Sequence, residues 1–194
     1  MKLLKDKLVL DKTLTKLDKA VLEFAKALEP LKYVIVSGYV SILLGRSRGT
    51  EDVDFVLERL SADEFEHLSK KLAKAGYWCI NPGDASELYN GLLAEGSAIR
   101  FAEKDTVIPN FEVRLAKDEV DGQALAKRLR VETAEGVIFI SPIEMQIAYK
   151  RHVLGSDKDI EDALHLEEVF KGQLDKIKLE KWSEGMKSYA KRHY

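Results

Sequence analysis

The sequence predicts an α/β fold of the α+β kind, with a mixed sheet flanked by helices and a helical C-terminal part. Up to residue 140, short β-branched or apolar runs alternate with segments of helical periodicity. After residue 140 the periodicity is helical only. We therefore expect a core at 1–140, which includes an N-terminal helix, and a helical region at 141–194 that packs on it.

The first third of the chain should form a helix, a strand, a short helix and a second strand, at 11–28, 33–36, 39–44 and 53–57. Asp11 is placed to cap the first helix, and Pro30 ends it, because the residue before a proline disfavours helical geometry. The run Tyr-Val-Ile-Val at 33–36 has the composition of a buried strand.

The middle of the chain alternates in the same way. The expected order is helix, strand, helix, two strands, helix and strand, at 61–75, 77–80, 85–94, 98–102, 107–115, 121–129 and 137–140. Ser61 and Glu64 form a capping box at the first of these helices, and Gly76 follows its end.

The last third is expected to contain helices at about 142–153, 157–170 and 178–190. Ser141 has the position of an N-cap and Pro142 that of a first helical residue. Glu144 completes a capping box with Ser141.

Composition excludes several classes of protein. The 194 residues are 45% hydrophobic and 33% charged, as in a globular domain with a real core. A net charge of −2 gives no overall attraction to nucleic acid or acidic lipid, so any phosphate site must be local. Cys79 is the only cysteine, which excludes a disulfide within the chain, and no apolar run reaches the roughly 20 residues that span a bilayer. We expect a cytoplasmic protein with no membrane partner.

The residues most typical of a chemical site are Asp52 and Asp54. One apolar residue separates them, so on a strand both carboxylates face the same way. Two like charges held so close repel each other, and a hard cation such as Mg²⁺ relieves the repulsion. The alternative is a solvated edge strand that carries two acids.

Phosphate-binding groups precede this pair. Ser37 and Gly38 come directly before a short helix, whose free N–H groups suit phosphate; the alternative is an ordinary tight turn. Arg46 and Arg48 lie on the following loop, where arginine can bind phosphate in a bidentate way, pair with an aspartate, or serve solubility alone. Thr50 can brace the turn before Asp52.

The run from Ser37-Gly38 through Gly-Arg-Ser-Arg-Gly-Thr to Asp52-x-Asp54 resembles the signature of the nucleotidyltransferase (polymerase beta-like) fold. It is most similar to the branch of minimal nucleotidyltransferases and AbiEii-type toxins. That branch has a third acid on a later strand, matched by Glu112, and a late lysine followed by K-D-x-x-D, matched by Lys150 and 158–162. The resemblance covers about residues 33–165.

The resemblance implies a Mg²⁺- or Mn²⁺-dependent transfer of NMP from a nucleoside triphosphate to a hydroxyl of a protein, a tRNA or a small molecule. It implies metal ligation and catalysis by Asp52, Asp54 and Glu112. It implies nucleotide contacts from Ser37, Gly38, Arg48, Thr50, Lys150 and Lys158. Toxins of this branch act on RNA or proteins, so it also implies a toxin–antitoxin role with an antitoxin partner.

Other interpretations stay open. Glu112 can be an exposed strand residue paired with Arg114 or a lysine, and Lys158 can pair with Asp162 on a solvated helix face. Ser37 replaces a family glycine, and Glu112 stands where aspartate is common. These departures leave room for a non-catalytic module of the same fold that binds nucleotide or protein, or for an interaction protein whose acids have no chemical role.

Overall fold

The computed structural model describes residues 1–4 and 7–193. Its described strands form one mixed sheet in the order β1-β2-β8-β9-β3-β4-β7-β6-β5. The strands are β1 Lys2–Leu3, β2 Lys7–Val9, β3 Tyr33–Val36, β4 Asp52–Leu57, β5 Tyr77–Cys79, β6 Ile99–Glu103, β7 Asn110–Leu115, β8 Leu129–Glu132 and β9 Val137–Ile140. Three neighbouring pairs, β2/β8, β3/β9 and β4/β7, are parallel and the others antiparallel, which confirms the predicted mixed sheet.

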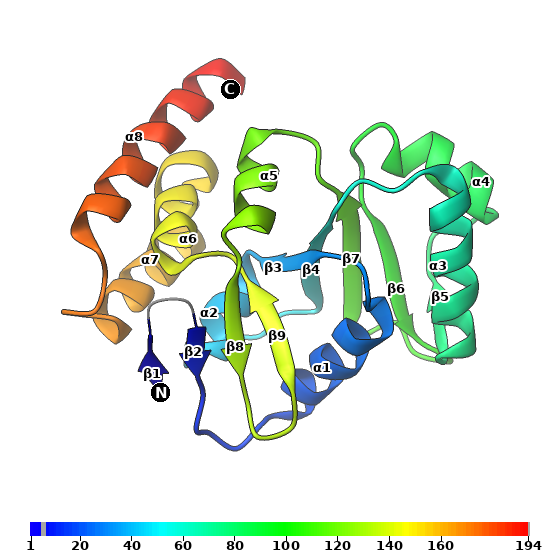
Figure 1. Cartoon of the computed structure of the whole chain (residues 1–194), viewed down its shortest axis with the longest axis horizontal. Helices are drawn as coiled ribbons and strands as arrows, with labels where there is room; N and C mark the ends of the chain where they lie inside the picture. The colour runs from blue at the N-terminus through cyan, green and yellow to red at the C-terminus, as the bar shows by residue number, and fades with distance from the viewer. Residues whose placement is uncertain (5–6, 194) are drawn as a thin grey trace.

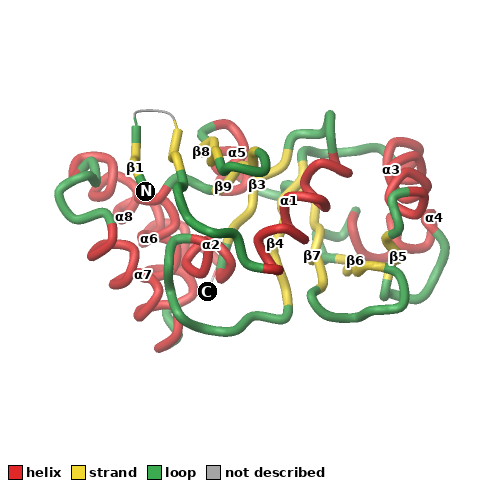
Figure 2. The backbone as a smooth tube through the Cα atoms, turned by 90° about the horizontal axis from the view of Figure 1, so that it is seen from below, coloured by secondary structure: helices red, strands yellow, loops and turns green. Residues whose placement is uncertain are grey.

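Helices flank this sheet and fill the C-terminal part, as predicted. They are α1 Lys16–Leu28, α2 Gly38–Leu43, α3 Ala62–Lys74, α4 Ala85–Leu88, α5 Glu119–Ala126, α6 Ile143–Tyr149, α7 Asp157–Val169 and α8 Lys176–His193, with π-helical turns η1 Tyr89–Leu93 and η2 Lys150–Leu154. Figures 1 and 2 show α6, α7 and α8 gathered at one end of the molecule and α3 and α4 at the other. The predicted boundary at residue 140 falls where β9 gives way to these helices and stays a prediction. Among the described residues, no helix is both long and apolar enough to cross a membrane.

Two hydrophobic cores lie on opposite faces of the sheet. The larger one centres on Phe24 of α1, whose ring stacks on Phe111 at 4.1 Å between centroids and meets Phe55 edge-on at 5.1 Å. Such aromatic pairs add about 0.5–1.5 kcal/mol each beyond the area they bury. The smaller core packs Val34 and Val56 of the other face against residues of α5, α6 and α8. It covers only part of that face, and Asp54 and Glu112 lie on the same face beside it.

The N-terminal region differs from the expectation. Helix α1 begins at Lys16, not near Asp11, because Thr15 caps it: the Thr15 hydroxyl accepts from the Asp18 amide and the Asp18 carboxylate accepts from the Thr15 amide. The short strands β1, β2 and β8 were not expected. Val131 of β8 is buried, but this strand is held by pairing with β2 and β9, which local sequence does not reveal.

The capping box expected at Ser141 is wrong. Pro142 takes the N-cap position of α6. Ser141 instead continues the pairing of β9, its amide donating to the Ile35 carbonyl at 2.9 Å, and its hydroxyl donates to Gln146. Glu144 accepts a hydrogen bond from the Asp175 amide. Tertiary pairing therefore overrides the local capping pattern.

Candidate active site

The three predicted acids lie on one face of the sheet. Strands β4 and β7 are parallel and in register, so that Asp54 lies opposite Glu112 and Asp52 opposite Asn110. This is the face of the smaller core, because Val36 of β3 pairs with Asp54. Opposite residues of neighbouring strands point to the same side, about 5 Å apart at the backbone. The fold thus brings Glu112 beside the Asp52–Asp54 pair, although it follows them by more than fifty residues.

Asp54 carries the electrostatic strain of this arrangement. Burial raises its pKa to about 6, and the charges of Asp52 and Glu112 add to the effect. A hydrogen bond from the Ser37 side chain and the charge of Arg114 offset part of this rise. At neutral pH the chain therefore holds a partly buried carboxylate among like charges. Carboxylates crowded in this way are typical of sites that receive a cation.

Hydrogen bonds fix the loop before β4 and the turn after β3. The Thr50 hydroxyl lies 2.9 Å from both the carbonyl oxygen and Oδ1 of Asp52, so it fixes that carboxylate. Ser37 has a positive φ of 63°, an unusual conformation for a residue with a Cβ. The Gln146 amide donates to the Ser37 carbonyl at 2.7 Å and accepts from the Ser141 hydroxyl at 2.7 Å. Helix α6 therefore holds the Ser37 turn in place.

Gly38 lies directly under the Arg48 side chain, and its predicted nucleotide contact stays a prediction. A Cβ added there would lie 2.1 Å from Nη2 of Arg48, so the guanidinium of Arg48 already fills the space over this glycine. Arg48 Nη2 also lies 3.2 Å from Oδ2 of Asp162 on α7. The glycine thus makes room for an arginine side chain, and the cation held there sits at the start of α2.

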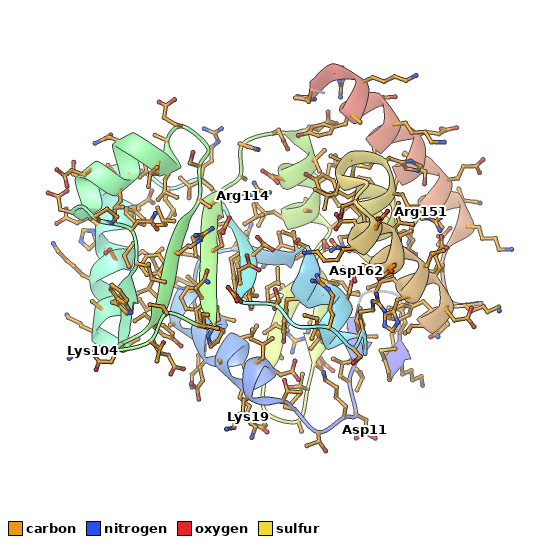
Figure 3. All side chains as sticks on the ribbon, turned by 180° about the vertical axis from the view of Figure 1, so that it is seen from behind. Asp11, Lys19, Lys104, Arg114, Arg151 and Asp162 are labelled. Atoms are coloured by element: carbon orange, nitrogen blue, oxygen red, sulfur yellow. The ribbon has the colours of Figure 1, made fainter. Side chains whose placement is uncertain are left out.

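Arg48 belongs to a buried cluster of charges that we call the Asp162 cluster: Asp162, Asp159, Lys150, Arg46 and Arg48. Lys150 Nζ, on a side chain only 1% exposed, lies 2.9 Å from Asp162 and 3.1 Å from Asp159. Arg46 reaches Asp162 at 3.5 Å and Glu161 at closer range. Figure 3 shows Asp162 where α7 meets α2. The cluster ties the loop before β4 to α7.

The late motif is therefore split by the fold. Lys150 is directed into the Asp162 cluster and not onto the surface of the site, whereas Lys158 lies exposed in the first turn of α7. The Lys158–Asp162 pair considered from the sequence is replaced, because Asp162 contacts Lys150, Arg46 and Arg48. The predicted nucleotide contacts of Lys150 and Lys158 stay predictions.

Glu112 and Arg114 have separate partners. Arg100 Nε on β6 donates to Glu112 Oε2 at 3.1 Å. Arg114, which the sequence offered as a partner for Glu112, forms a two-pronged pair with Asp121 of α5, with Nη2 2.7 Å from Oδ1. Lys117 donates its amide to the same aspartate. Figure 3 labels Arg114 on β7.

The donor set fits a divalent cation at Asp52 and Asp54, because oxygen ligands of like charge on one strand face favour Mg²⁺ or Mn²⁺. Within residues 1–4 and 7–193, no three His, Cys, Asp or Glu side chains are gathered closely enough to enclose a metal ion. The third carboxylate, Glu112, is turned to Arg100. The residues therefore fit a two-carboxylate site with a neighbouring acid.

A pocket of about 180 Å³ opens beside Asp54. It lies between the sheet and helices α5 and α6, at the border of the smaller core. Its lining consists of Val36, Ser37, Asp54, Arg114, Val120, Asp121, Ala124, Ser141, Met145, Gln146, Tyr149 and Leu154. A mostly apolar lining with a few polar groups is typical of small-molecule sites.

Sequence reasoning missed several of these residues. Arg100 gives no local signal, because only the β6–β7 register places it against Glu112. Gln146 and Asp121 lie on helices whose docking onto the sheet is tertiary. Arg114 was open to prediction as a site residue, since it is two positions after Glu112 on the same strand and so faces the same way.

No protein-family model matches the chain, and no curated protein matches its sequence. Solved structures do match its fold. A nucleotidyltransferase-like antigenic protein from Paracoccidioides brasiliensis aligns over 90% of this chain and 88% of its own, with a TM-score of 0.51 and 16% identity. The antibiotic-resistance factor ANT(2'')-Ia aligns over 90% and 92%, with the same TM-score and identity. The chain therefore has a nucleotidyltransferase-like fold.

Proposed function

We propose that this protein is a metal-dependent nucleotidyltransferase. It would move NMP from a nucleoside triphosphate to a hydroxyl of an acceptor, with release of pyrophosphate. The observation that carries the proposal is the acid pair Asp52–Asp54 beside Glu112 on one sheet face, next to the braced turn at Ser37. The likeness in fold to nucleotidyltransferases supports the same class of reaction.

Each group of the site has a task in this reaction. Mg²⁺ or Mn²⁺ bound at Asp52 and Asp54 would supply positive charge to the phosphate oxygens. Thr50 holds the Asp52 carboxylate in place, and the Arg48 guanidinium over Gly38 at the start of α2 would supply positive charge to the phosphates. The pocket beside Asp54 would hold one ring of a bound substrate.

The chemical step needs a base and an in-line geometry. The acceptor oxygen attacks the α-phosphorus, the bond from that phosphorus to its bridging oxygen breaks, and pyrophosphate leaves. Glu112, on the strand next to Asp54, would accept the proton of the attacking hydroxyl. Holding the two reactants side by side accounts for much of the rate in reactions of this kind.

The finer part of the proposal concerns the AbiEii-type branch. The run from Ser37 to Asp54 and the late Lys150 and 158–162 motif support it, with a protein or RNA as acceptor and an antitoxin as partner. Lys150 is buried against Asp162, which in turn contacts Arg46 and Arg48. The late motif would therefore support the loop at 45–50, in addition to any contact it makes with substrate.

A second candidate is a non-catalytic module of the same fold that binds nucleotide or protein. One observation favours it: Glu112 is paired with Arg100, and the described residues hold no complete three-acid metal site. Such a module would bind nucleotide without turnover.

The deciding experiment incubates the protein with each α-labelled nucleoside triphosphate, Mg²⁺ and cell extract, and compares the wild type with Asp52→Asn/Asp54→Asn. We expect labelled protein, RNA or small-molecule product with the wild type only. Asp11→Asn, which changes an exposed aspartate in the loop before α1, is the matched control and should keep activity.

Two outcomes would count against the enzyme. Product that forms equally with the double variant would show that the acids do not catalyse it. Absence of product with every triphosphate, together with a nucleotide-dependent rise in melting temperature, would favour the binding module.

A further inference from the structure

A row of three charged side chains crosses the sheet at the candidate site. Asp54 of β4 lies opposite Glu112 of β7, and Glu112 lies opposite Arg100 of β6. Since paired residues of adjacent strands share a face, the three side chains stand in line, with strands about 4.8 Å apart. The row thus reads acid, acid, base from the middle of the sheet toward its edge.

Arg100 is built to hold Glu112. Its Nε lies 3.1 Å from Glu112 Oε2, and the side chains are 55% and 27% exposed. Its backbone is fixed from the side of β5, because its amide donates to the Asn81 side chain at 2.7 Å and its carbonyl accepts from the Ile80 amide at 2.8 Å. The strand position of Arg100 is therefore set independently of the ion pair.

The neighbouring arginine does not compete for Glu112. Arg114 lies two residues further along β7 on the same face, but both of its Nη atoms are engaged by Asp121. Among the described residues, Arg100 is the cation paired with Glu112. A guanidinium stays charged at every pH at which the protein folds, so this counter-charge is permanent.

We propose that Arg100 is a resident counter-charge that keeps Glu112 from ligating metal, so that the site binds one divalent cation at Asp52–Asp54 instead of two. This inference rests on the metal site of the proposed function. Two-metal sites need carboxylates that bridge ions about 3.5–4 Å apart. Here Glu112, the carboxylate that would complete the second metal position, is already neutralised by Arg100. Arg100 acts through Glu112 and is a positioning residue.

The test is metal stoichiometry, measured with Mn²⁺ alone on chelator-stripped protein by calorimetry and by loss of the free-ion EPR signal. We expect one Mn²⁺ per wild-type chain. Arg100→Gln frees Glu112 and should add a second bound Mn²⁺, or tighten binding at least fivefold. Arg100→Lys keeps the charge and should restore the wild-type result, and Arg100→Gln/Glu112→Gln should return to one ion.

Arg130→Gln is the matched control. Arg130 also lies on a strand, away from the site, and its Nε lies 2.9 Å from Oε1 of a glutamate, Glu132. It should leave the stoichiometry at one. Two Mn²⁺ on the wild type, or identical binding by wild type and Arg100→Gln, would overturn the inference. Failure of the transfer assay with one ion on the wild type and two on Arg100→Gln would overturn the proposed function and leave this inference standing.

Discussion

The three acids on the sheet, Asp52, Asp54 and Glu112, and the Asp162 cluster are two groups of charges that are arranged in opposite ways. On the sheet, Asp54 lies beside Asp52 and Glu112, and this crowding together with burial raises its pKa to about 6. In the Asp162 cluster, a fully buried aspartate meets three cations, one of them the buried Lys150. Among the acids on the sheet, Glu112 is paired with Arg100, while Asp54 lines the pocket among like charges. In the Asp162 cluster the buried acids are paired with cations.

The difference separates a site from its support. A fold gains nothing in stability from like charges held together, so their presence indicates a task that a cation or substrate completes. Opposite charges buried together fix the position of the elements that carry them. The loop at 45–50 connects the two groups, because Arg48 contacts Asp162 and Thr50 contacts Asp52.

The largest effect is expected when the Asp162 cluster is broken. Asp162→Asn leaves Lys150 buried beside Asp159 alone, removes the aspartate that Arg48 contacts and leaves Arg46 with Glu161. Removing one partner of a buried ion pair costs about 3–5 kcal/mol. We expect a loss of that size in the free energy of unfolding, measured by urea denaturation.

Asp157→Asn is the control for this loss, since Asp157 is an exposed aspartate in the first turn of the same helix. Its cost should stay below about 1 kcal/mol, the size of a helix-dipole contribution. Equal losses in the two variants would show that the Asp162 cluster contributes no more than the helix start.

The same chemical change on the sheet should act with the opposite sign. The pKa of Asp54 is raised from 3.8 to about 6, which corresponds to about 3 kcal/mol at 1.36 kcal/mol per pH unit. A carboxyl with a raised pKa in the folded state destabilises it once ionised. The penalty is absent below pH 3.8, grows as the pH rises toward 6, and is complete above that value.

Asp54→Asn removes this penalty. In chelator, we expect the variant to be more stable than the wild type by up to about 3 kcal/mol at pH 8, with no difference near pH 3.5. Denaturation at both pH values, at equal ionic strength, measures it. A stabilisation that is the same at both values would mean that packing, and not charge, is responsible.

A smaller effect is expected from filling the acid site with its cation. Mg²⁺ that binds the folded chain at ten times its Kd stabilises it by about 1.4 kcal/mol, which for a chain of this size raises Tm by about 4 °C. We expect this rise in Tm in the wild type and in the control variant Asp11→Asn, whose exposed aspartate lies outside both groups of charges. Asp52→Asn/Asp54→Asn should show none. An equal rise in the double variant would place the cation elsewhere.

Much of this fold could be predicted from the sequence, because its signals are local. The strand at 33–36 and the capping box of α3 are as expected, since they depend on residues within a few positions. The short strands β1 and β2 and the cap of α6 could not be predicted, because pairing between distant segments decides them.

The site divides in the same way. The Asp52–Asp54 pair and its face follow from strand alternation alone. The match of Glu112 to the acid pair is a register between two parallel strands, and the capture of Glu112 by Arg100 is a second register. Burial of Lys150 depends on how α7 docks against η2, which no local pattern encodes. Sequence thus locates charges, and tertiary structure decides which of them meet.

The smallest loss of stability is expected for Gly38→Ala, which tests the contact of Arg48 with Asp162. In Gly38→Ala the added methyl would meet Arg48 Nη2 at 2.1 Å, and the flexible guanidinium must move away from Asp162. Lys150 still neutralises Asp162, so we expect a loss of only about 1 kcal/mol in the free energy of unfolding, the size of one hydrogen-bonded contact. A cycle with Arg48→Gln separates this contact from other effects of the methyl. If the link is real, Gly38→Ala costs nothing further once Arg48 is gone; two additive losses would show that the glycine serves the backbone and not the arginine.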